Sequence, residues 1–159
     1  MKKKEEKKNI RLSKKALTYV ATWFLLGVFF GSILSLQNQI EPFTKSMLYG
    51  FSIYLENYNE FAWSVAFYLI SFPVFFIMIK PEVEVENKIT KEQRLIFFAL
   101  IPCFLLMGAG FITPDVNGMF SKLIKNIILY GGWIGASFCF FISYYLTAVF
   151  LAIGLNKNK

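Results

Sequence analysis

Side chains suited to acid–base or metal chemistry are scarce in this chain. Histidine is absent, which removes the commonest proton-transfer group and a common ligand of zinc and haem. Glu56 and Glu60 are four residues apart and could form a carboxylate pair on one helix face, although such pairs are more often solvated helix ends. The two cysteines, Cys103 and Cys139, lie inside apolar runs, where we expect buried thiols; whether they meet is open. We therefore expect no enzyme, no metal and no cofactor.

Small residues have a more informative spacing. Gly27 and Gly31 form a GxxxG pair, and a second pair begins a longer series. That series, in steps of four, is Gly131, Gly135, Cys139, Ser143 and Thr147. A four-residue step keeps side chains close to one helix face, where another helix backbone can approach closely. Two interpretations remain open: packing among the protein's own helices, or docking of a partner's helix, with a homo-oligomer through the GxxxG faces as one form of the latter.

The composition is that of an integral membrane protein. Of the 159 residues, 56% are hydrophobic and only 17% are charged, against about a quarter in a soluble domain. A soluble protein of this size could not bury so much apolar surface. The net charge of +7 is concentrated between long apolar blocks, whereas a nucleic-acid-binding protein would spread its basic residues among polar ones. We therefore expect no nucleic-acid partner.

Four uncharged stretches are long enough to cross about 30 Å of hydrocarbon, which takes roughly 20 helical residues. They cover approximately residues 16–36, 61–79, 95–112 and 127–155. The first is longer than a signal-peptide core and no small-residue cleavage pattern follows it, so we expect it to be retained. Because backbone groups in lipid must bond to one another, the sequence predicts an all-α integral membrane protein. We expect one domain, 1–159, with four transmembrane helices in a bundle.

The basic residues predict the orientation of these helices. Of the 17 Lys and Arg side chains, 14 lie in the N-terminal flank 1–15, in the loop 80–94 or in the C-terminal tail. The other three are Lys45, Lys122 and Lys125. Because basic residues accumulate in cytoplasmic loops, we predict that both termini are cytoplasmic. The basic N-terminal flank should also bind anionic membrane lipids.

The two loops on the opposite side each begin with a proline followed by an amphipathic pattern. Met47, Leu48, Phe51 and Leu55 recur at near-helical spacing after Pro42. A similar series after Pro114 contains Met119, Phe120, Leu123, Ile124 and Ile127. Each loop could hold a separate helix lying in the membrane interface, or it could be the first turns of the next membrane helix.

The layout resembles the immunity proteins against pore-forming colicins of the colicin A and B type. The resemblance covers nearly the whole chain, but most of it is architecture. Its local pieces are Ile40-Glu41-Pro42-Phe43, Leu48-Tyr49, Ile79-Lys80-Pro81, Gly118-Met119-Phe120-Ser121-Lys122-Leu123, Asn126 and Ile128-Leu129-Tyr130. The Thr-Thr-Ala-Gly stretch associated with that family before the fourth span is absent, and residues 113–118 stand in its place.

The resemblance implies a multi-pass protein of the bacterial inner membrane that is not an enzyme. It would bind the inserting pore-forming domain of a protein toxin and prevent the channel from opening. Candidate partner-binding residues are the series from Gly131 to Thr147 and the outer charges Glu41, Lys45, Lys122 and Lys125. Two other functions fit the sequence: an anchoring subunit of a secretion or conjugation machine, and a small oligomeric transporter or channel.

Overall fold

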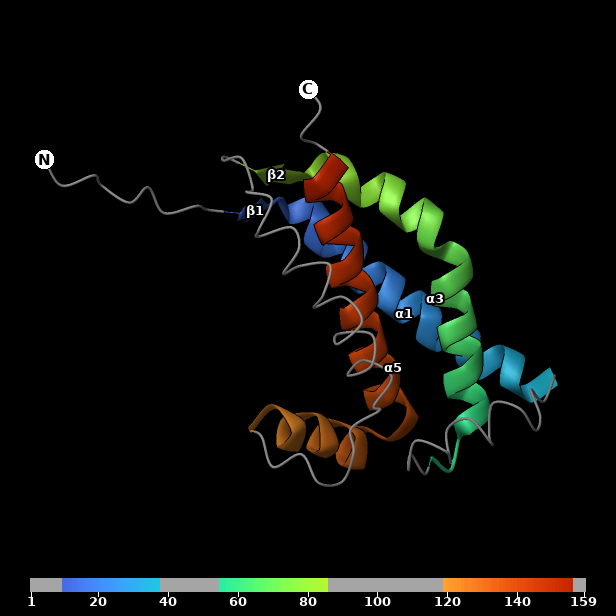
Figure 1. Cartoon of the computed structure of the whole chain (residues 1–159). Coiled ribbons are helices and arrows are strands. Elements are labelled where there is room, and N and C mark those ends of the chain that lie inside the picture. The colour runs from blue at the N-terminus through green and yellow to red at the C-terminus, as the bar shows by residue number, and fades with distance from the viewer. Residues whose placement is uncertain (1–9, 38–54, 86–118, 156–159) are drawn as a thin grey trace, which may run out of the picture.

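A computed structural model of the chain describes residues 10–37, 55–85 and 119–155 (Figure 1). Its elements are the helices α1 (Lys14–Gln37), α3 (Tyr58–Ile79) and α5 (Met119–Leu155), the 3₁₀ turn η1 (Lys80–Glu82), and the strands β1 (Ile10–Leu12) and β2 (Val83–Val85). Within these described ranges, three helices are long and apolar enough to cross a membrane, which agrees with the helical character that the sequence predicts. The predicted third span, 95–112, lies outside the described residues.

Helix α1 begins at a serine cap and buries only one face. The amide N–H of Ala16 donates to Ser13 Oγ at 3.1 Å, which satisfies one of the free donors of the first turn. Ala16, Gly27 and Gly31 are the buried residues of this helix. On the opposite side, large apolar residues such as Leu25 are 64% exposed. Lipid would cover such a face in a membrane.

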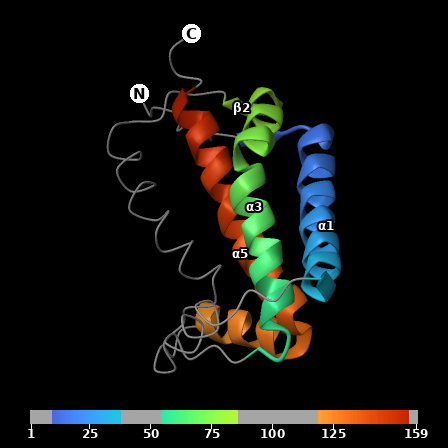
Figure 2. The same cartoon turned by 90° about the vertical axis from the view of Figure 1, so that its right-hand side faces the viewer.

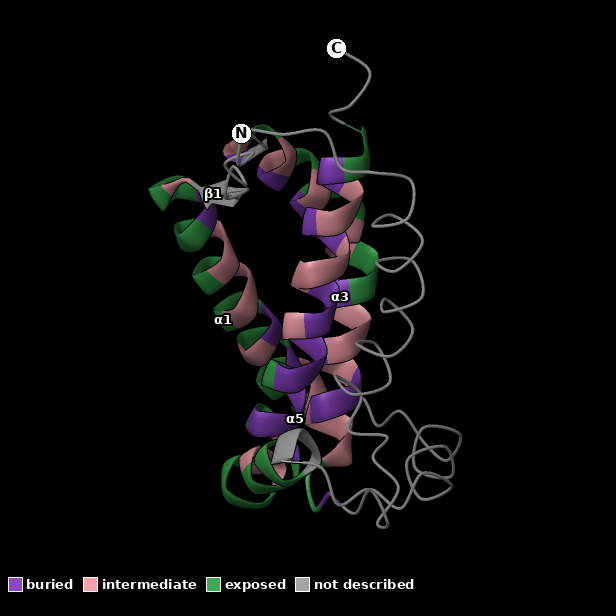
Figure 3. Cartoon of the chain, turned by 60° about the vertical axis from the view of Figure 1, so that its left-hand side comes forward, coloured by how far each residue is buried: buried purple, intermediate pink, exposed green. Residues whose placement is uncertain are grey.

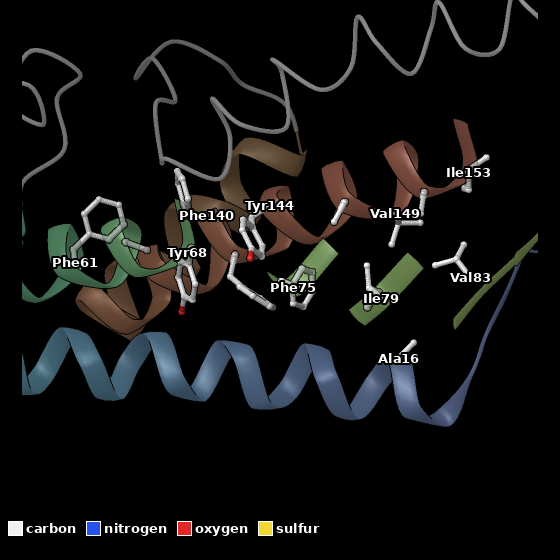
Figure 4. Close-up of a cluster of buried hydrophobic side chains, with 14 of the residues drawn as sticks. Ala16, Phe61, Tyr68, Phe75, Ile79, Val83, Phe140, Tyr144, Val149 and Ile153 are labelled. Atoms are coloured by element: carbon white, nitrogen blue, oxygen red, sulfur yellow. The ribbon is translucent and has the colours of Figure 1, made fainter. Parts of the chain in front are cut away.

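Helix α3 packs against both α1 and α5, and aromatic rings fill the contact (Figures 2 and 4). The ring centroid of Tyr68 lies 5.0 Å from that of Phe141 on α5, and the ring of Phe75 lies 5.0 Å from that of Tyr144. Tyr68, Phe75 and Phe141 are each no more than 1% exposed. Tilted ring pairs of this kind add to the stability that burial provides.

The two ends of the molecule differ. At one end, which we call the ribbon end, β1 pairs antiparallel with β2, with Leu12 opposite Val83. Val83 is 2% exposed and belongs to the same buried cluster as Ala16 and Ile153 (Figure 4). The opposite end, which we call the far end, contains the last turn of α1, the first turn of α3 and the beginning of α5 (Figure 1).

Helix α5 is broken at Gly132, whose φ of 53° and ψ of −137° are not helical. Glycine has no Cβ and therefore adopts this conformation at low cost. Residues 119–131 form a separate helical segment, which lies across the far end instead of continuing the long segment 133–155 (Figure 1). Of the two interpretations of this loop, a helical segment separate from the rest of α5 matches the structure.

Candidate partner-binding faces

The segment 119–131, which we call the far-end helix, exposes apolar and basic side chains together. Leu129 is 74% exposed and Tyr130 is 86% exposed, while Lys122 and Lys125 are also exposed. Ile124, in contrast, is only 6% exposed. Figure 3 shows that much of this segment is exposed, below the buried core formed by α3 and the rest of α5. An apolar and basic surface at the end of a group of membrane-length helices is suited to contact a partner or lipid headgroups.

Gly135 lets the far-end helix fold back onto the long part of α5. A Cβ atom at Gly135 would collide with the backbone carbonyl of Ile127. Gly131, in contrast, is exposed and has no heavy atom within 4 Å of the position where a Cβ would lie. The two glycines therefore have different surroundings, although the sequence places them in one GxxxG pair.

The predicted groove along α5 is not a continuous helix face. The break at Gly132 separates Gly131 from the other members of the series, because a four-residue step keeps one face only in an unbroken helix. Cys139 and Ser143 are 7% and 3% exposed, and Thr147 is half-buried. The Oγ of Ser143 donates to the Cys139 carbonyl at 3.2 Å, and Thr147 Oγ1 donates to the Ser143 carbonyl at 2.8 Å. The protein's own packing thus occupies this face.

The other GxxxG pair brings α1 close to α3. A Cβ atom at Gly27 would overlap the ring of Tyr68, and one at Gly31 would lie 2.6 Å from the carbonyl oxygen of Glu60. Small residues allow two helices to approach to this distance in a membrane. Gly27 and Gly31 therefore form an internal contact, and their face is not free for a second copy of the chain.

Three side-chain hydrogen bonds among the described residues join neighbouring helices. The hydroxyls of Ser64 on α3 and Ser137 on α5 lie 2.6 Å apart, and both residues are fully buried. Trp23 Nε1 on α1 donates to Ser71 Oγ on α3 at 3.1 Å. Tyr68 Oη donates to the Phe24 carbonyl at 3.0 Å. These bonds connect the three helices across their apolar contact, which leaves these groups little capacity to line a polar path.

The charged candidates lie at the far end or outside the described residues. Glu56 is exposed and precedes α3, whereas Glu60 is half-buried in its first turn. Glu41 and Lys45 lie outside the described residues, as does Cys103. Among residues 10–37, 55–85 and 119–155, no group of three Cys, Asp or Glu side chains could hold a metal ion.

The strand ribbon is a feature that the sequence interpretation missed. The run Glu82-Val83-Glu84-Val85-Glu86 reads as an extended polar linker, yet its alternation of apolar and charged residues is also the pattern of a strand with one buried face. Ser13 Oγ donates to a carboxylate oxygen of Glu82, and the Ser13 amide donates to the Glu82 carbonyl at 3.3 Å. One serine therefore caps α1 and also ties it to η1.

No protein-family model, curated protein or solved structure matches the chain.

Proposed function

We propose that this protein is an inner-membrane immunity protein that binds the inserting pore-forming domain of a colicin-like bacteriocin and blocks channel opening. The observation that carries this proposal is the far-end helix, whose exposed Leu129 and Tyr130 lie beside the exposed basic residues Lys122 and Lys125. A toxin that inserts from outside would reach this surface before it reaches the spans.

The proposal includes an orientation and a fourth span. The ribbon end is cytoplasmic, because the basic N-terminal flank 1–15 includes β1 and the basic loop 80–94 includes η1 and β2. The far end then faces the outside. Strand β2 and the beginning of α5 lie at opposite ends of the molecule, which supports a membrane crossing by the apolar stretch 95–112 between them (Figure 1). Both termini would then be cytoplasmic, in a bundle of four helices.

The interior of the described helices favours a binding protein over a transporter. The span hydroxyls of Ser64, Ser71 and Ser137 are all engaged in bonds between helices. The surfaces of α1 and α3 that point away from the core are apolar, as Leu25 and Ile70 illustrate with 64% and 81% exposure. Such surfaces can contact either lipid or a partner helix, which is what blocking an inserting protein requires.

Survival of toxin-challenged bacteria tests the proposal. Cells that express the chain should survive at least one member of a panel of pore-forming bacteriocins that kills the parent strain. Leu129→Ser should lower the tolerated toxin dose about tenfold, which corresponds to one buried apolar contact at an interface. Leu17→Ser is the matched control, because Leu17 is 71% exposed, close to the 74% of Leu129, but lies at the ribbon end.

Two results would contradict the proposal. One is killing by every member of the panel although the protein is present in the membrane. The other is an equal effect of Leu129→Ser and Leu17→Ser. A large stable complex with other membrane proteins in mild detergent would instead favour an anchoring subunit, and solute flux in liposomes would favour a transporter.

A further inference from the structure

The far-end helix carries a basic stripe beside an apolar stripe. Lys122 and Lys125 are three residues apart, so they lie on one helix face, and both are exposed. Leu123 and Tyr130 are seven residues apart, so they share the neighbouring face, where they are 54% and 86% exposed. Ile124, which is 6% exposed, marks the side that faces away from both stripes. The exposed part of this short helix therefore combines two cations with two side chains that have large apolar surfaces.

The bend in α5 fixes the direction of the far-end helix. Gly132 interrupts the helix, and the backbone at Gly135 lies so close to the Ile127 carbonyl that no Cβ atom would fit. This contact holds the far-end helix across the end of the long segment 133–155 instead of in line with it (Figures 1 and 2). At 1.5 Å per residue the long segment spans roughly 34 Å, enough to cross a bilayer by itself. The far-end helix would then lie along the membrane surface.

We propose that the far-end helix is an interfacial helix that binds anionic phospholipids. Lys122 and Lys125 contact the lipid phosphates, while Leu123 and the ring of Tyr130 enter the boundary between headgroups and acyl chains. Charge complementarity selects the lipid, because two lysines within one turn attract an anionic headgroup more strongly than a zwitterionic one. The apolar stripe selects a membrane over a soluble polyanion, since free phosphate or nucleic acid would leave Leu123 in water.

The lipid contact does not rest on the proposed function, but it leaves a surface for it. Leu129 is seven residues after Lys122 and four after Lys125, so it lies on the basic face and not on the apolar stripe. An interfacial helix would hold Leu129 in the headgroup layer, which an inserting protein has to cross. The survival test therefore replaces Leu129, whereas the lipid test leaves it unchanged.

The test uses the full chain in phosphatidylcholine vesicles that contain a brominated lipid, either phosphatidylglycerol or phosphatidylcholine. A fluorophore is attached at Asn126→Cys, with both native cysteines replaced by alanine, and bromine quenches it on contact. Asn126 is exposed and lies between Leu123 and Tyr130 on the same side, so the label replaces neither. Half-maximal quenching should need about twentyfold less brominated phosphatidylglycerol than phosphatidylcholine, because each lysine contributes about fivefold.

The lysine variants test which charges hold the lipid. Lys122→Gln and Lys125→Gln should each lower the preference for phosphatidylglycerol about fivefold. Lys14→Gln is the matched control, because Lys14 is also exposed but lies at the ribbon end, and it should leave the preference unchanged. Raising the salt concentration should weaken the preference of the parent chain, since screening reduces the attraction between exposed charges.

Equal quenching by the two brominated lipids would overturn the inference, as would an equal effect of Lys122→Gln and Lys14→Gln. A label that aqueous iodide quenches and neither lipid reaches would place the far-end helix in water and also overturn it. These outcomes are separate from the survival test. A lipid preference that is lost in Lys122→Gln, together with no protection against any toxin, would keep the lipid contact and remove the immunity function.

Discussion

The hydroxyl of Ser64 on α3 lies 2.6 Å from the hydroxyl of Ser137 on α5, where neither side chain is exposed. Ser64 Oγ also lies 2.8 Å from the Phe61 carbonyl, which can only accept. A serine hydroxyl has one proton, so Ser64 donates to Phe61 and Ser137 must donate to Ser64. The two serines therefore have unequal roles in joining α3 to α5.

Because Ser64 and Ser137 have unequal roles, their alanine variants should lower the free energy of unfolding by different amounts. Ser64→Ala removes the acceptor of the Ser137 proton and should lower the free energy of unfolding by about 1 kcal/mol. Ser137→Ala leaves Ser64 bonded to Phe61 and should cost about half as much. Unfolding in mixed detergent micelles measures both. Ser32→Ala is the control, because the exposed Ser32 hydroxyl donates only to the Val28 carbonyl of its own helix. Equal costs at positions 64 and 137 would show that the donor assignment is wrong.

The contact between α1 and α3 should tolerate no side chain at Gly27. Gly27→Ala places a methyl group against the ring of Tyr68 and should destabilise the fold by about 1–3 kcal/mol, the usual cost of overpacking. Gly154→Ala is the matched control, because a Cβ there has no heavy atom within 4 Å and alanine favours the helix. Thermal unfolding in detergent compares them. A neutral Gly27→Ala variant would mean that α1 does not pack closely on α3.

The bend of α5 should depend on Gly132 and not on its neighbour. Gly132→Ala forces a Cβ into a left-handed conformation and should cost about 1–3 kcal/mol or straighten the helix. Gly131→Ala has open space and should be tolerated. Spin labels at Leu123→Cys and Leu155→Cys, with both native cysteines replaced by alanine, report the bend. A straight helix would separate these positions by roughly 48 Å, and the native bend should hold them closer.

A lengthened distance in Gly132→Ala, with an unchanged distance in Gly131→Ala, would confirm this prediction. The same distance distribution in both variants and in the parent would show that packing at Gly135 holds the bend without help from Gly132.

The ribbon end should depend on the two bonds of Ser13. Ser13→Ala removes the acceptor of the Ala16 amide and the donor to Glu82, and should cost about 1 kcal/mol as a lost cap. Ser13→Asp keeps a capping oxygen but brings a second carboxylate to Glu82. Hydrogen exchange should therefore show fraying of both α1 and β1 in Ser13→Ala, but of β1 alone in Ser13→Asp. Unchanged exchange of the β1 amides in both variants would contradict the role of Glu82.

Local sequence information was sufficient to predict helices long and apolar enough to cross a membrane. The helices α1 and α3 enclose the predicted spans 16–36 and 61–79, because long uncharged apolar runs have only one common backbone solution in lipid. Amphipathic periodicity also indicated the far-end helix as one of two alternatives. The orientation, the fourth span and the immunity function stay proposals.

The spacing of the small residues did not predict which of them lie in a contact between helices and which lie at a bend. The sequence shows two GxxxG pairs of equal form. Gly27 and Gly31 allow α3 to approach α1 closely, whereas Gly131 and Gly135 lie on either side of the break at Gly132. Whether a glycine allows two helices to approach closely or allows one helix to bend depends on which segments pack against it. The same holds for the strand ribbon. The alternation of apolar and charged residues in Glu82–Glu86 forms a strand only where residues 10–12 pair with it.

Composition and apolar run length thus determined that the described residues form helices long and apolar enough to cross a membrane, because lipid favours that solution for each run separately. Only the tertiary structure decided which faces are used inside the protein and which remain exposed. The Ser64–Ser137 bond, the Tyr68 contact with Gly27 and the exposure of Ile70 each depend on how α3 is rotated between its neighbours. That rotation is set by packing between segments far apart in the chain, which no local pattern specifies.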